Sequence, residues 1–462
     1  LPNLDFKIIA ANTLIAAPQE HEAMGVKVED EFFTKFSDLT HDYFKVANPD
    51  DKHKLRDKIE TLINAKCAEK IKAIESLSHN EAKYKKQIDQ LESHKKLWQS
   101  YANLFKHEAV AFFEPRYFFP QLSGGFDIVI GNPPYVISND KRLKERYAES
   151  VYGRSNLYGF FIHLSIESLM NENGILSFIN PKTILADAYF SGLRKFILNH
   201  AKVSQILDIN NRKDVFENVL QSVIVNFYSK KSDKTKVKNI STKDEILLNN
   251  HIFISQEDMI FDDKNTSIFI VSRHPETYKI FKRLKDFPSF QEAGIKFTTG
   301  KIQWDLYKKY LSDSPANDCT QLIWAENIQR FFLQPAKLRA DKIYLNTSID
   351  DKILINHQTI VVQRTTAVEQ SYRIIATIID PLSFGYSIQT ENNTSYIEKT
   401  NPDLDLKFIL SLLNSRFYDF IFRHINSNTH VSGGELNSLP DSKNSRNRAT
   451  TVYQISGQNP CR

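Results

Sequence analysis

The sequence predicts an α/β protein whose first half centres on a doubly wound parallel sheet and whose second half is mainly β. Two observations lead to this class. Residues 123–230 alternate apolar strand patterns with helical patterns, an order that favours a parallel sheet covered by helices. From residue 231 onward, short strands such as "KILI" and "TIVVQR" stand among Asn, Thr and Ser.

Composition sets limits on the type of protein. The chain has 462 residues, of which 41% are apolar and 25% charged, as in ordinary globular proteins. Its net charge of +5 is compatible with nucleic-acid binding without being specific for it. No apolar run reaches about 18 residues, so no membrane span is expected. The three scattered cysteines form no C-x-x-C pair, which suggests neither a zinc site nor a disulfide framework and fits a reducing cytoplasm.

Two regions precede the alternating part. Residues 1–15 contain a strand candidate, "FKIIA", at 6–10. Residues 16–122 are rich in Lys, Glu and His, and apolar residues at helical spacing predict a helical hairpin over roughly 51–77 and 80–106. The charged face of this hairpin is interpreted as solvated; contact with DNA is the alternative.

The alternating part contains four apolar strand patterns and two helical ones. "FDIVIG" at 126–131 is a continuous apolar run, typical of a strand covered on both faces. A helix is expected over 156–173 with Gly174 as its C-cap, followed by the strand "GILSFINP" and a helix over 186–199. "VSQILDI" and "SVIVNFYS" complete the sheet. Ligands of such sheets bind at the carboxyl ends of the strands, where Asn132 to Tyr135 stand.

The C-terminal region is expected to form a separate domain over 231–436. An amphipathic helix is predicted over 405–425. Asp405 and Lys407 have the D-x-K form of nuclease sites, but we interpret Asp405 as an acid at the start of this helix. Residues 437–462 are polar and lack a pattern, so a disordered tail is expected.

"NPPY" at 132–135 carries the most specific chemistry. An exocyclic amino group on a base is a poor nucleophile, because its lone pair is delocalised into the ring. Asn132 offers a side-chain carbonyl and Pro133 a backbone carbonyl to the two N–H bonds, while Pro133 and Pro134 restrict the backbone that holds them. Tyr135 offers a flat face for stacking on the base, worth about 1–3 kcal/mol. The alternative is a simple turn; the position directly after an apolar strand favours the catalytic interpretation.

This stretch resembles motif IV of amino-group methyltransferases that use S-adenosylmethionine. "NLYGFFIHLSIESLMNENGILSFINP" is similar to motifs V and VI of adenine-N6 DNA methyltransferases, and "DVFENVLQSVIVNF" to motif VIII. "LPNLDFKIIAANTLI" is similar to motif III. Together with the helical insert and the β-rich region, residues 1 to about 440 resemble the methyltransferase and target-recognition part of type IIG restriction–modification enzymes.

The resemblance implies a fold, a reaction and further site residues. The fold is a partial Rossmann-like methyltransferase sheet, made of residues 1–15 and 123–230, with 16–122 as the insertion. The reaction is site-specific methyl transfer from S-adenosylmethionine to N6 of an adenine flipped out of double-stranded DNA. Phe216 would pack on that adenine, and Asn12 and Asn156 would lie near the cofactor. The alternatives are a core aromatic for Phe216 and a turn residue for Asn12; the family often has an acidic residue at the position of Asn156.

Target recognition is assigned to the connector and domain over 231–436, and within it to 290–436. Gln363 and Arg364 stand at a predicted strand end, with Arg373 on the next strand. Gln can pair with adenine and Arg with guanine in the major groove. Ordinary surface positions are the alternative for each residue. "NTHVSGG" at 428–434 is interpreted as a tight loop, whose glycines either permit close approach to a backbone or simply make a turn.

The family's cofactor loop is missing from this sequence. The chain has 14 glycines, but no Gly-x-Gly occurs. We therefore expect an upstream segment of the same polypeptide to carry this loop. Two other readings remain: a methyltransferase acting on RNA or on protein glutamine, and a DNA-specificity fragment without catalysis of its own.

A first prediction concerns cofactor binding. The 462-residue chain alone should bind S-adenosylmethionine weakly or not at all, because it lacks the glycine loop for the methionine end of the cofactor. Calorimetric titration measures this directly, and micromolar affinity would contradict the prediction.

Overall fold

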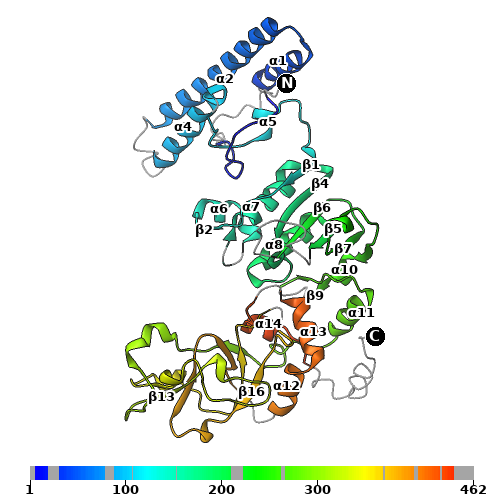
Figure 1. Ribbon diagram of the computed structural model, residues 1–462. Helices are drawn as coiled ribbons and strands as arrows, with labels where there is room; N and C mark the ends of the chain where they lie inside the picture. Colours follow the sequence, from blue (N-terminus) through cyan, green and yellow to red (C-terminus); the bar gives the residue numbers. More distant parts are fainter. Residues whose placement is uncertain are drawn as a thin grey trace. The chain divides into compact units, whose positions relative to one another are not determined.

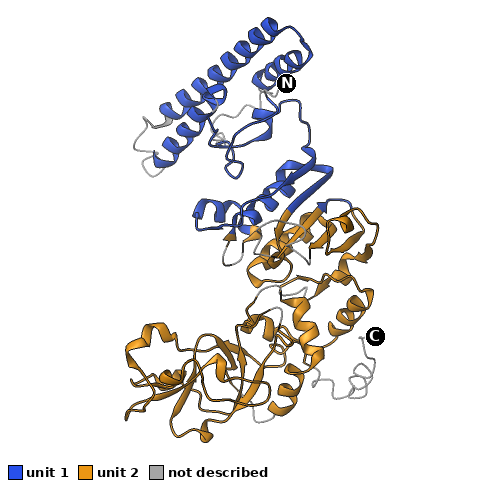
Figure 2. Cartoon of the chain, viewed as in Figure 1, with its two compact units in different colours: residues 1–148, 156–178, 228–231 blue, residues 149–155, 179–227, 232–462 orange. Residues whose placement is uncertain are grey.

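A computed structural model of the chain describes residues 6–18, 31–78, 88–106, 108–151, 153, 155–209, 222–261, 266–367, 370–399, 404–426 and 429–441. The chain divides into two compact units, coloured separately in Figure 2. Unit 1 comprises residues 1–148, 156–178 and 228–231, and unit 2 comprises 149–155, 179–227 and 232–462. Among the described residues, no helix is both long and apolar enough to span a membrane.

Unit 1 begins with a helical part, drawn in blue and cyan in Figure 1. Its helices are α1 (Glu31–Lys45), α2 (Pro49–Ser78), α4 (Ile88–Ala102) and α5 (Pro115–Phe118). Helices α2 and α4 pack on each other, which confirms the predicted hairpin in its described part. Helix α1 was not predicted.

The core of the helical part is aromatic. Trp98, Tyr101, Phe112 and Tyr117 are almost fully buried, and their rings meet mainly edge to face. Such aromatic pairs add to the free energy gained from buried area. The helical part therefore has a hydrophobic core of its own.

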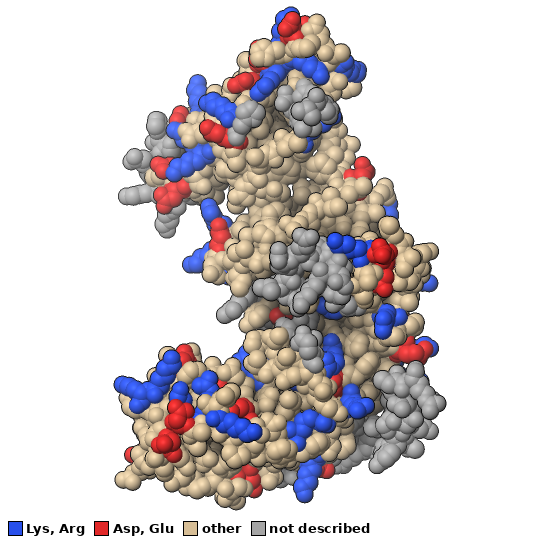
Figure 3. Space-filling model, viewed as in Figure 1, with Lys and Arg blue, Asp and Glu red and all other residues tan. Residues whose placement is uncertain are grey.

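The surface of the helical part carries side chains of both charges. Lysines pair with acids in Lys35–Glu31, Lys54–Asp51 and Lys95–Glu75. On the face shown in Figure 3, Lys and Arg stand next to Asp and Glu over these helices. Mixed charge of this kind favours the interpretation of a solvated face over a DNA-binding one.

The predicted strand at 6–10 is wrong. These residues form a turn, with Phe6 at a φ of 59°. Phe6 packs on Tyr43 and Phe105 with ring centroids 5.1 and 5.6 Å apart. Packing against the helices therefore overrides the local apolar pattern.

A six-stranded sheet follows, in the order β1-β4-β6-β5-β7-β8. Its strands are β1 (Phe126–Gly131), β4 (Met170–Pro181), β5 (Lys202–Ile209), β6 (Val223–Ser229), β7 (Lys234–Ile240) and β8 (Ile252–Ser255). Strands β1 and β4 pair in parallel, as do β5 and β7, whereas β7 and β8 are antiparallel. The α/β class is confirmed, and the sheet continues past the boundary expected at residue 230.

Two sequence expectations within this sheet are corrected. Helix α7 (Leu157–Leu164) and a short π-helical turn (Ser165–Leu169) lead directly into β4, so Gly174 lies in a strand and caps no helix. A Cβ on Gly174 would stand 2.7 Å from the carbonyl oxygen of Phe126, so this glycine permits the close approach of β1. Helix α8 begins at Ser191 and ends at His200, later than the predicted start at 186.

Strand β1 is not covered on both faces as predicted. The side chains of Ile128 and Ile130 are 68% and 78% exposed, and Ile175 on β4 is 44% exposed. Ile128 and Ile175 are direct partners in the parallel ladder. The described structure therefore leaves an apolar patch on one face of β1 and β4, at the end of the strand order.

The remainder of unit 2 contains two four-stranded sheets and several helices. The first sheet has the order β11-β18-β15-β16 and the second β12-β14-β13-β17. The strands of the first are β11 (Phe297–Thr299), β15 (Thr359–Gln363), β16 (Ala376–Ile379) and β18 (Thr394–Ile397). Those of the second are β12 (Leu311–Ser312), β13 (Thr320–Ile323), β14 (Tyr344–Leu345) and β17 (Ser387–Thr390). The helices are α10 (Gln256–Met259), α11 (Pro275–Leu284), α12 (Leu406–Leu413), α13 (Arg416–Ile425) and α14 (Gly433–Asn437), and a two-stranded pair joins β9 (Ile260–Phe261) to β10 (Ile268–Phe269).

The single helix predicted over 405–425 is two helices. Helix α12 ends before Asn414, and Ser415 caps α13 by accepting a hydrogen bond from the backbone N–H of Tyr418. Buried Asn414 exchanges two hydrogen bonds with the backbone of Ala376 on β16. The Asp405 side chain accepts from the N–H of Phe408, which confirms its role at the start of the helix.

The C-terminal glycines lie in an ordered segment. Ser432 and Glu435 form a capping box at the start of α14. A Cβ on Gly433 would stand 2.8 Å from the carbonyl oxygen of Phe297, so the close backbone approach expected of this segment is confirmed. Leu436 and Leu439 are fully buried. The expected disordered tail is therefore wrong for 437–441, and 442–462 lie outside the described residues.

A second prediction tests the aromatic core of the helical part. Phe112→Ala removes a ring with no exposed surface and should lower the free energy of unfolding of this part by about 3–5 kcal/mol, through lost burial and a cavity. Urea unfolding followed by circular dichroism measures the change.

Ile8→Ala is the matched control, because Ile8 is 71% exposed in the same unit and its loss should stay within about 0.5 kcal/mol. Equal effects of the two substitutions would contradict the assignment of the core.

Candidate functional site

The end of strand β1 turns sharply at Asn132, Pro133, Pro134 and Tyr135. Gly131, the last residue of β1, pairs with Phe178 on β4, and a Cβ there would stand 3.0 Å from the Phe178 ring. Pro133 is buried, whereas the side chains of Asn132 and Pro134 are exposed. Because neither proline has an N–H group, the ladder cannot continue through them.

The hydroxyl of Tyr135 orients the side chain of Asn132. Tyr135 Oη donates a hydrogen bond to Asn132 Oδ1 over 3.2 Å. Partial burial raises the pKa of Tyr135, so its phenol stays neutral and able to donate at physiological pH. A carbonyl oxygen has two lone pairs, so Asn132 Oδ1 can accept a second hydrogen bond while it is held by Tyr135.

The start of helix α7 lies next to this corner. The Tyr135 ring meets fully buried Tyr158 edge to face, with centroids 6.0 Å apart. The backbone N–H of Leu157 donates to the carbonyl of Val136 over 2.8 Å. Asn156, predicted near the cofactor, is the N-cap of α7, and its side chain accepts from the N–H of Tyr158 over 3.4 Å. One backbone hydrogen bond and one edge-to-face ring contact thus join the corner segment to the start of the helix.

A cavity of about 440 Å³ in unit 1 brings two predicted site segments together. Asn12, the other residue predicted near the cofactor, and Pro134 both line it. Leu14, Leu157 and Phe161 contribute apolar walls. Sequence reasoning missed Leu157 and Phe161; their signal is the spacing of one helical turn just after the capping Asn156.

The lining of this cavity also includes a charged pair. Asp140 and Arg142 line it, and their side chains form an ion pair of 3.0 Å. The hydrogen bond from the Arg142 side chain lowers the pKa of Asp140, and this carboxylate also caps α6 (Lys141–Arg146). The cavity thus combines apolar walls, an amide and a charged pair. Among the described residues, no group of three or more His, Cys, Asp or Glu side chains could hold a metal ion.

Arg373, predicted to contact a base, lies inside unit 2. Its side chain is 1% exposed and donates to Thr366 Oγ1 over 3.1 Å and to Asn426 Oδ1 over 3.0 Å. Its guanidinium also lies over the ring of Phe422. A guanidinium enclosed in this way cannot reach a base edge, so this expectation is corrected and Arg373 is a buried structural residue.

The other predicted DNA contacts are half-buried. Gln363 Nε2 donates to the carbonyl of Ile328 over 2.7 Å, and Arg364 Nη1 donates to the carbonyl of Asn392 over 3.1 Å. Both side chains therefore brace neighbouring loops, which leaves their contact with DNA a prediction. Phe216, predicted to pack on the flipped adenine, lies outside the described residues.

A parallel strand that ends in Asn-Pro-Pro-Tyr beside an apolar cavity, in an α/β sheet, is typical of amino-group methyltransferases. Residues 26–216 match the family of the Eco57I restriction-modification methylase. The resemblance to restriction–modification methyltransferases is thereby confirmed, and this segment carries the methylase domain.

Named relatives agree with this family. The chain is 27% identical over 327 residues to the type II methyltransferase M.PstI of Providencia stuartii and 25% identical over 329 residues to M.BsuBI of Bacillus subtilis. Each match covers 68% of this chain and 64% of the relative, so the chain spans less than two thirds of the length of these proteins. Its structure is similar to the type IIL restriction–modification enzyme MmeI solved in complex with DNA, at 13% identity and a TM-score of 0.38, over 68% of this chain and 45% of that one. A similarity that distant does not bear on function.

A third prediction tests the structural role of Asn156 as the N-cap of α7. Asn156→Ala removes the N-cap of α7 and should lower the free energy of unfolding by about 0.5–2 kcal/mol. Asn156→Asp keeps a capping oxygen and should leave the stability nearly unchanged. Thermal unfolding of the three proteins measures both effects, and an Asp variant as unstable as the Ala variant would argue against the cap.

Proposed function

We propose that the complete protein transfers a methyl group from S-adenosylmethionine to N6 of adenine at specific sites in double-stranded DNA, as part of a type IIG-like restriction–modification system. The observation that carries this proposal is the Asn132–Tyr135 corner at the end of β1, where a hydroxyl holds an exposed amide oxygen in place. The methylase family and its type II relatives support the reaction class and the DNA substrate.

The corner would act on the amino group of the base. Asn132 Oδ1 and the backbone carbonyl of Pro133 accept its two N–H bonds, which draws the nitrogen towards a tetrahedral geometry and frees its lone pair. Because Tyr135 and the paired prolines fix the acceptors beforehand, little reorganisation is needed when a base enters. The ring of Tyr135 stacks on the base, and Phe216 packs on its other side.

An adenine within a duplex is out of reach of this corner. The base must therefore be flipped out of the helix, which requires binding energy from contacts to the rest of the DNA. We assign these contacts to the β-rich region over 231–436, with Gln363 and Arg364 among its candidates. A cytoplasmic location follows from a DNA substrate of this kind.

The cavity beside Pro134 fits one end of the cofactor. S-adenosylmethionine, when bound, supplies an electrophilic methyl group and has an adenine that needs a flat apolar site with a polar edge. Leu14, Leu157 and Phe161 offer such walls, and Asn12 offers an amide at the edge. Asn156 would act indirectly, by fixing the start of α7.

The methionine end of the cofactor would be held by a further segment of the protein. In the described structure Ile128 and Ile130 leave one face of β1 largely exposed, and β1 is the last strand of the sheet. An additional strand would pair with the free edge of β1, and a helix would cover the exposed face of β1 and β4. We propose that an upstream segment carrying a Gly-x-Gly loop covers this face.

The uncovered face also favours a second candidate function. Without a complementing segment, the chain would recognise DNA as a specificity fragment and leave catalysis to a partner. Methylation of RNA or of protein glutamine is a further alternative within the same chemistry.

A fourth prediction tests the corner. In the complete protein, Asn132→Ala should lower the rate of methyl transfer to an adenine-containing duplex by about a hundredfold or more, because one of the two oriented acceptors is lost. Tritium from labelled S-adenosylmethionine incorporated into DNA measures the rate.

Leu247→Ala is the control, since this side chain is 91% exposed and lies outside the corner and the cavity. Unchanged transfer in Asn132→Ala would rule out the proposed mechanism. Incorporation into protein or RNA but not into DNA would favour the substrate alternative, and none in any substrate would favour the specificity fragment.

A further inference from the structure

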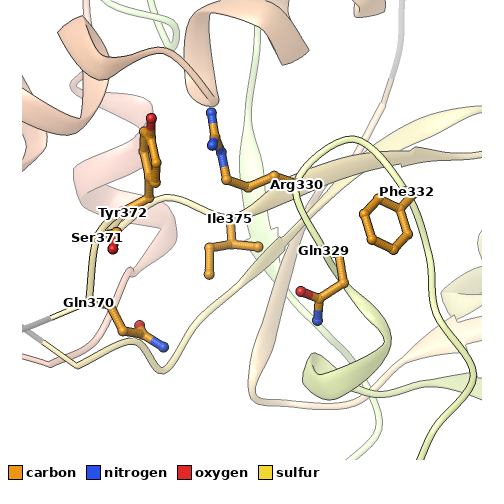
Figure 4. Close-up of a pocket in the computed structure, with 7 residues that line it drawn as sticks. All are labelled: Gln329, Arg330, Phe332, Gln370, Ser371, Tyr372 and Ile375. Atoms are coloured by element: carbon orange, nitrogen blue, oxygen red, sulfur yellow. The ribbon is translucent and has the colours of Figure 1, made fainter.

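Unit 2 contains a second cavity, of about 280 Å³, next to Gln363, whose backbone N–H donates to the carbonyl of the lining residue Ile375. A tight turn at 329–332 forms one wall and the segment 370–372 forms the other, with Ile375 at the base (Figure 4). We call these two segments the turn and the facing segment. The sequence did not point to the turn, although "QRFF" at 329–332 places an arginine beside two aromatics; the facing segment directly precedes the predicted Arg373.

Arg330 of the turn stacks on the aromatic ring of Tyr372 in the facing segment. The guanidinium carbon of Arg330 lies 3.6 Å from the ring centroid of Tyr372, and the two side chains lie side by side in Figure 4. Arg330 Nη2 also donates to the carbonyl of Asn414 over 2.6 Å, which holds the guanidinium in this plane. Arg416 Nε donates to Tyr372 Oη over 3.4 Å, so a second cation contacts the hydroxyl of the same tyrosine.

The charge of this stack is positive. The hydrogen bond from Arg416 and the charge of Arg330 lower the pKa of Tyr372. In the described part of the chain, Arg330 contacts a backbone carbonyl and an aromatic ring rather than a carboxylate. None of the described residues that line the cavity is acidic, and Arg330 gives this lining a positive charge.

The turn presents two aromatic rings to solvent. Phe331 has a φ of 74°, a left-handed conformation that a bulky residue rarely adopts. Two backbone hydrogen bonds hold it there, from Gln329 N–H to the Phe332 carbonyl and from Phe331 N–H to the Ala376 carbonyl, each 3.0 Å long. Phe331 and Phe332 are 54% and 58% exposed as a result. A strained backbone that exposes apolar rings is typical of a functional surface.

The ligand that fits these groups is a nucleobase in DNA. Exposed aromatic rings can stack on bases, Arg330 can meet guanine or a phosphate, and the carboxamides of Gln329 and Gln370 can pair with adenine. In Figure 4 both carboxamides lie below the Arg330–Tyr372 pair, and each wall of the cavity contributes one of them. Gln329 Nε2 and Arg330 Nη2 each donate one hydrogen bond to a backbone carbonyl, of Glu326 and Asn414, and their remaining polar atoms suit a polar ligand better than an apolar one.

We propose that the turn at 329–332 and the facing segment at 370–372 read bases of the DNA target. This inference rests on the proposed function, because it names the surface that selects the DNA site. Gln363 is a positioning residue for this surface. Its side chain donates to the carbonyl of Ile328 and so holds the residue directly before the turn.

Binding of duplex DNA by the complete protein tests this assignment. A library of randomised duplexes is first used to select the preferred sequence of the unaltered protein, and fluorescence anisotropy then measures affinity for that duplex and for a scrambled one. Phe331→Gly removes the ring while keeping a residue that tolerates the left-handed backbone. Arg330→Gln removes the charge. Each variant should bind the selected duplex about tenfold or more weakly, with a smaller change for the scrambled duplex.

Leu382→Ala is the matched control, because Leu382 is a 94% exposed apolar residue of the same unit outside the cavity. Its affinity for both duplexes should equal that of the unaltered protein. Gln363→Glu should lower affinity for the selected duplex in the same direction as Phe331→Gly, whereas a purely structural Gln363 would alter thermal stability alone.

The outcomes distinguish this inference from the proposed function. Sequence-selective binding that Phe331→Gly and Arg330→Gln leave intact would overturn the inference alone and point to a protein-binding surface. An equal loss for both duplexes would show contact with phosphates without base reading, and would overturn it too. If the unaltered protein selects no sequence at all, both the inference and the proposed DNA function fall.

Discussion

Two consecutive prolines at the end of strand β1 are the constraint on which the rest of the site depends. They stop the ladder with β4 at Gly131 and turn the chain so that Asn132 is exposed and Pro133 buried. The chain that follows then secures the corner, through the Tyr135 hydroxyl on Asn132 and the Leu157 N–H on Val136. The acceptor geometry is therefore built from the two prolines and one local hydrogen bond, and the start of α7 supports it through a second hydrogen bond and the Tyr158 ring.

The apolar patch on β1 and β4 affects the stability of the sheet. Burial of apolar surface stabilises by about 25 cal/mol per Å², so the exposed side chains of Ile128, Ile130 and Ile175 represent stabilisation that the described chain does not use. One complementing segment, as proposed, would account both for this patch and for the absence of a Gly-x-Gly loop in the sequence. Folding and cofactor binding would then be coupled, because the same segment would complete the sheet and the site.

The sequence predicted those features that depend on local chemistry. The apolar runs of β1, β5 and β6 and the corner at Asn132 follow from residue type and order, and the helical hairpin follows from spacing. Features decided by distant partners were missed. "FKIIA" has a strand pattern, but the Phe6 ring packs against Tyr43 of α1. Arg373 resembles a surface cation in the sequence, but its buried guanidinium donates hydrogen bonds to Thr366 and Asn426. The break between α12 and α13 likewise depends on Asn414 binding the backbone of β16, which no local pattern reveals.

The way in which the helical part joins the chain has a consequence for how the protein varies. Its two ends are joined by a short parallel pairing. The Asn12 N–H donates to the Val110 carbonyl and the Phe113 N–H to the Ile15 carbonyl, each over 2.8 Å. The entropy of closing a loop grows only slowly with its length. Because these bonds hold the two ends together and the aromatic core stabilises the described residues between them, the length of this insertion can change while the Asn132–Tyr135 corner keeps its geometry.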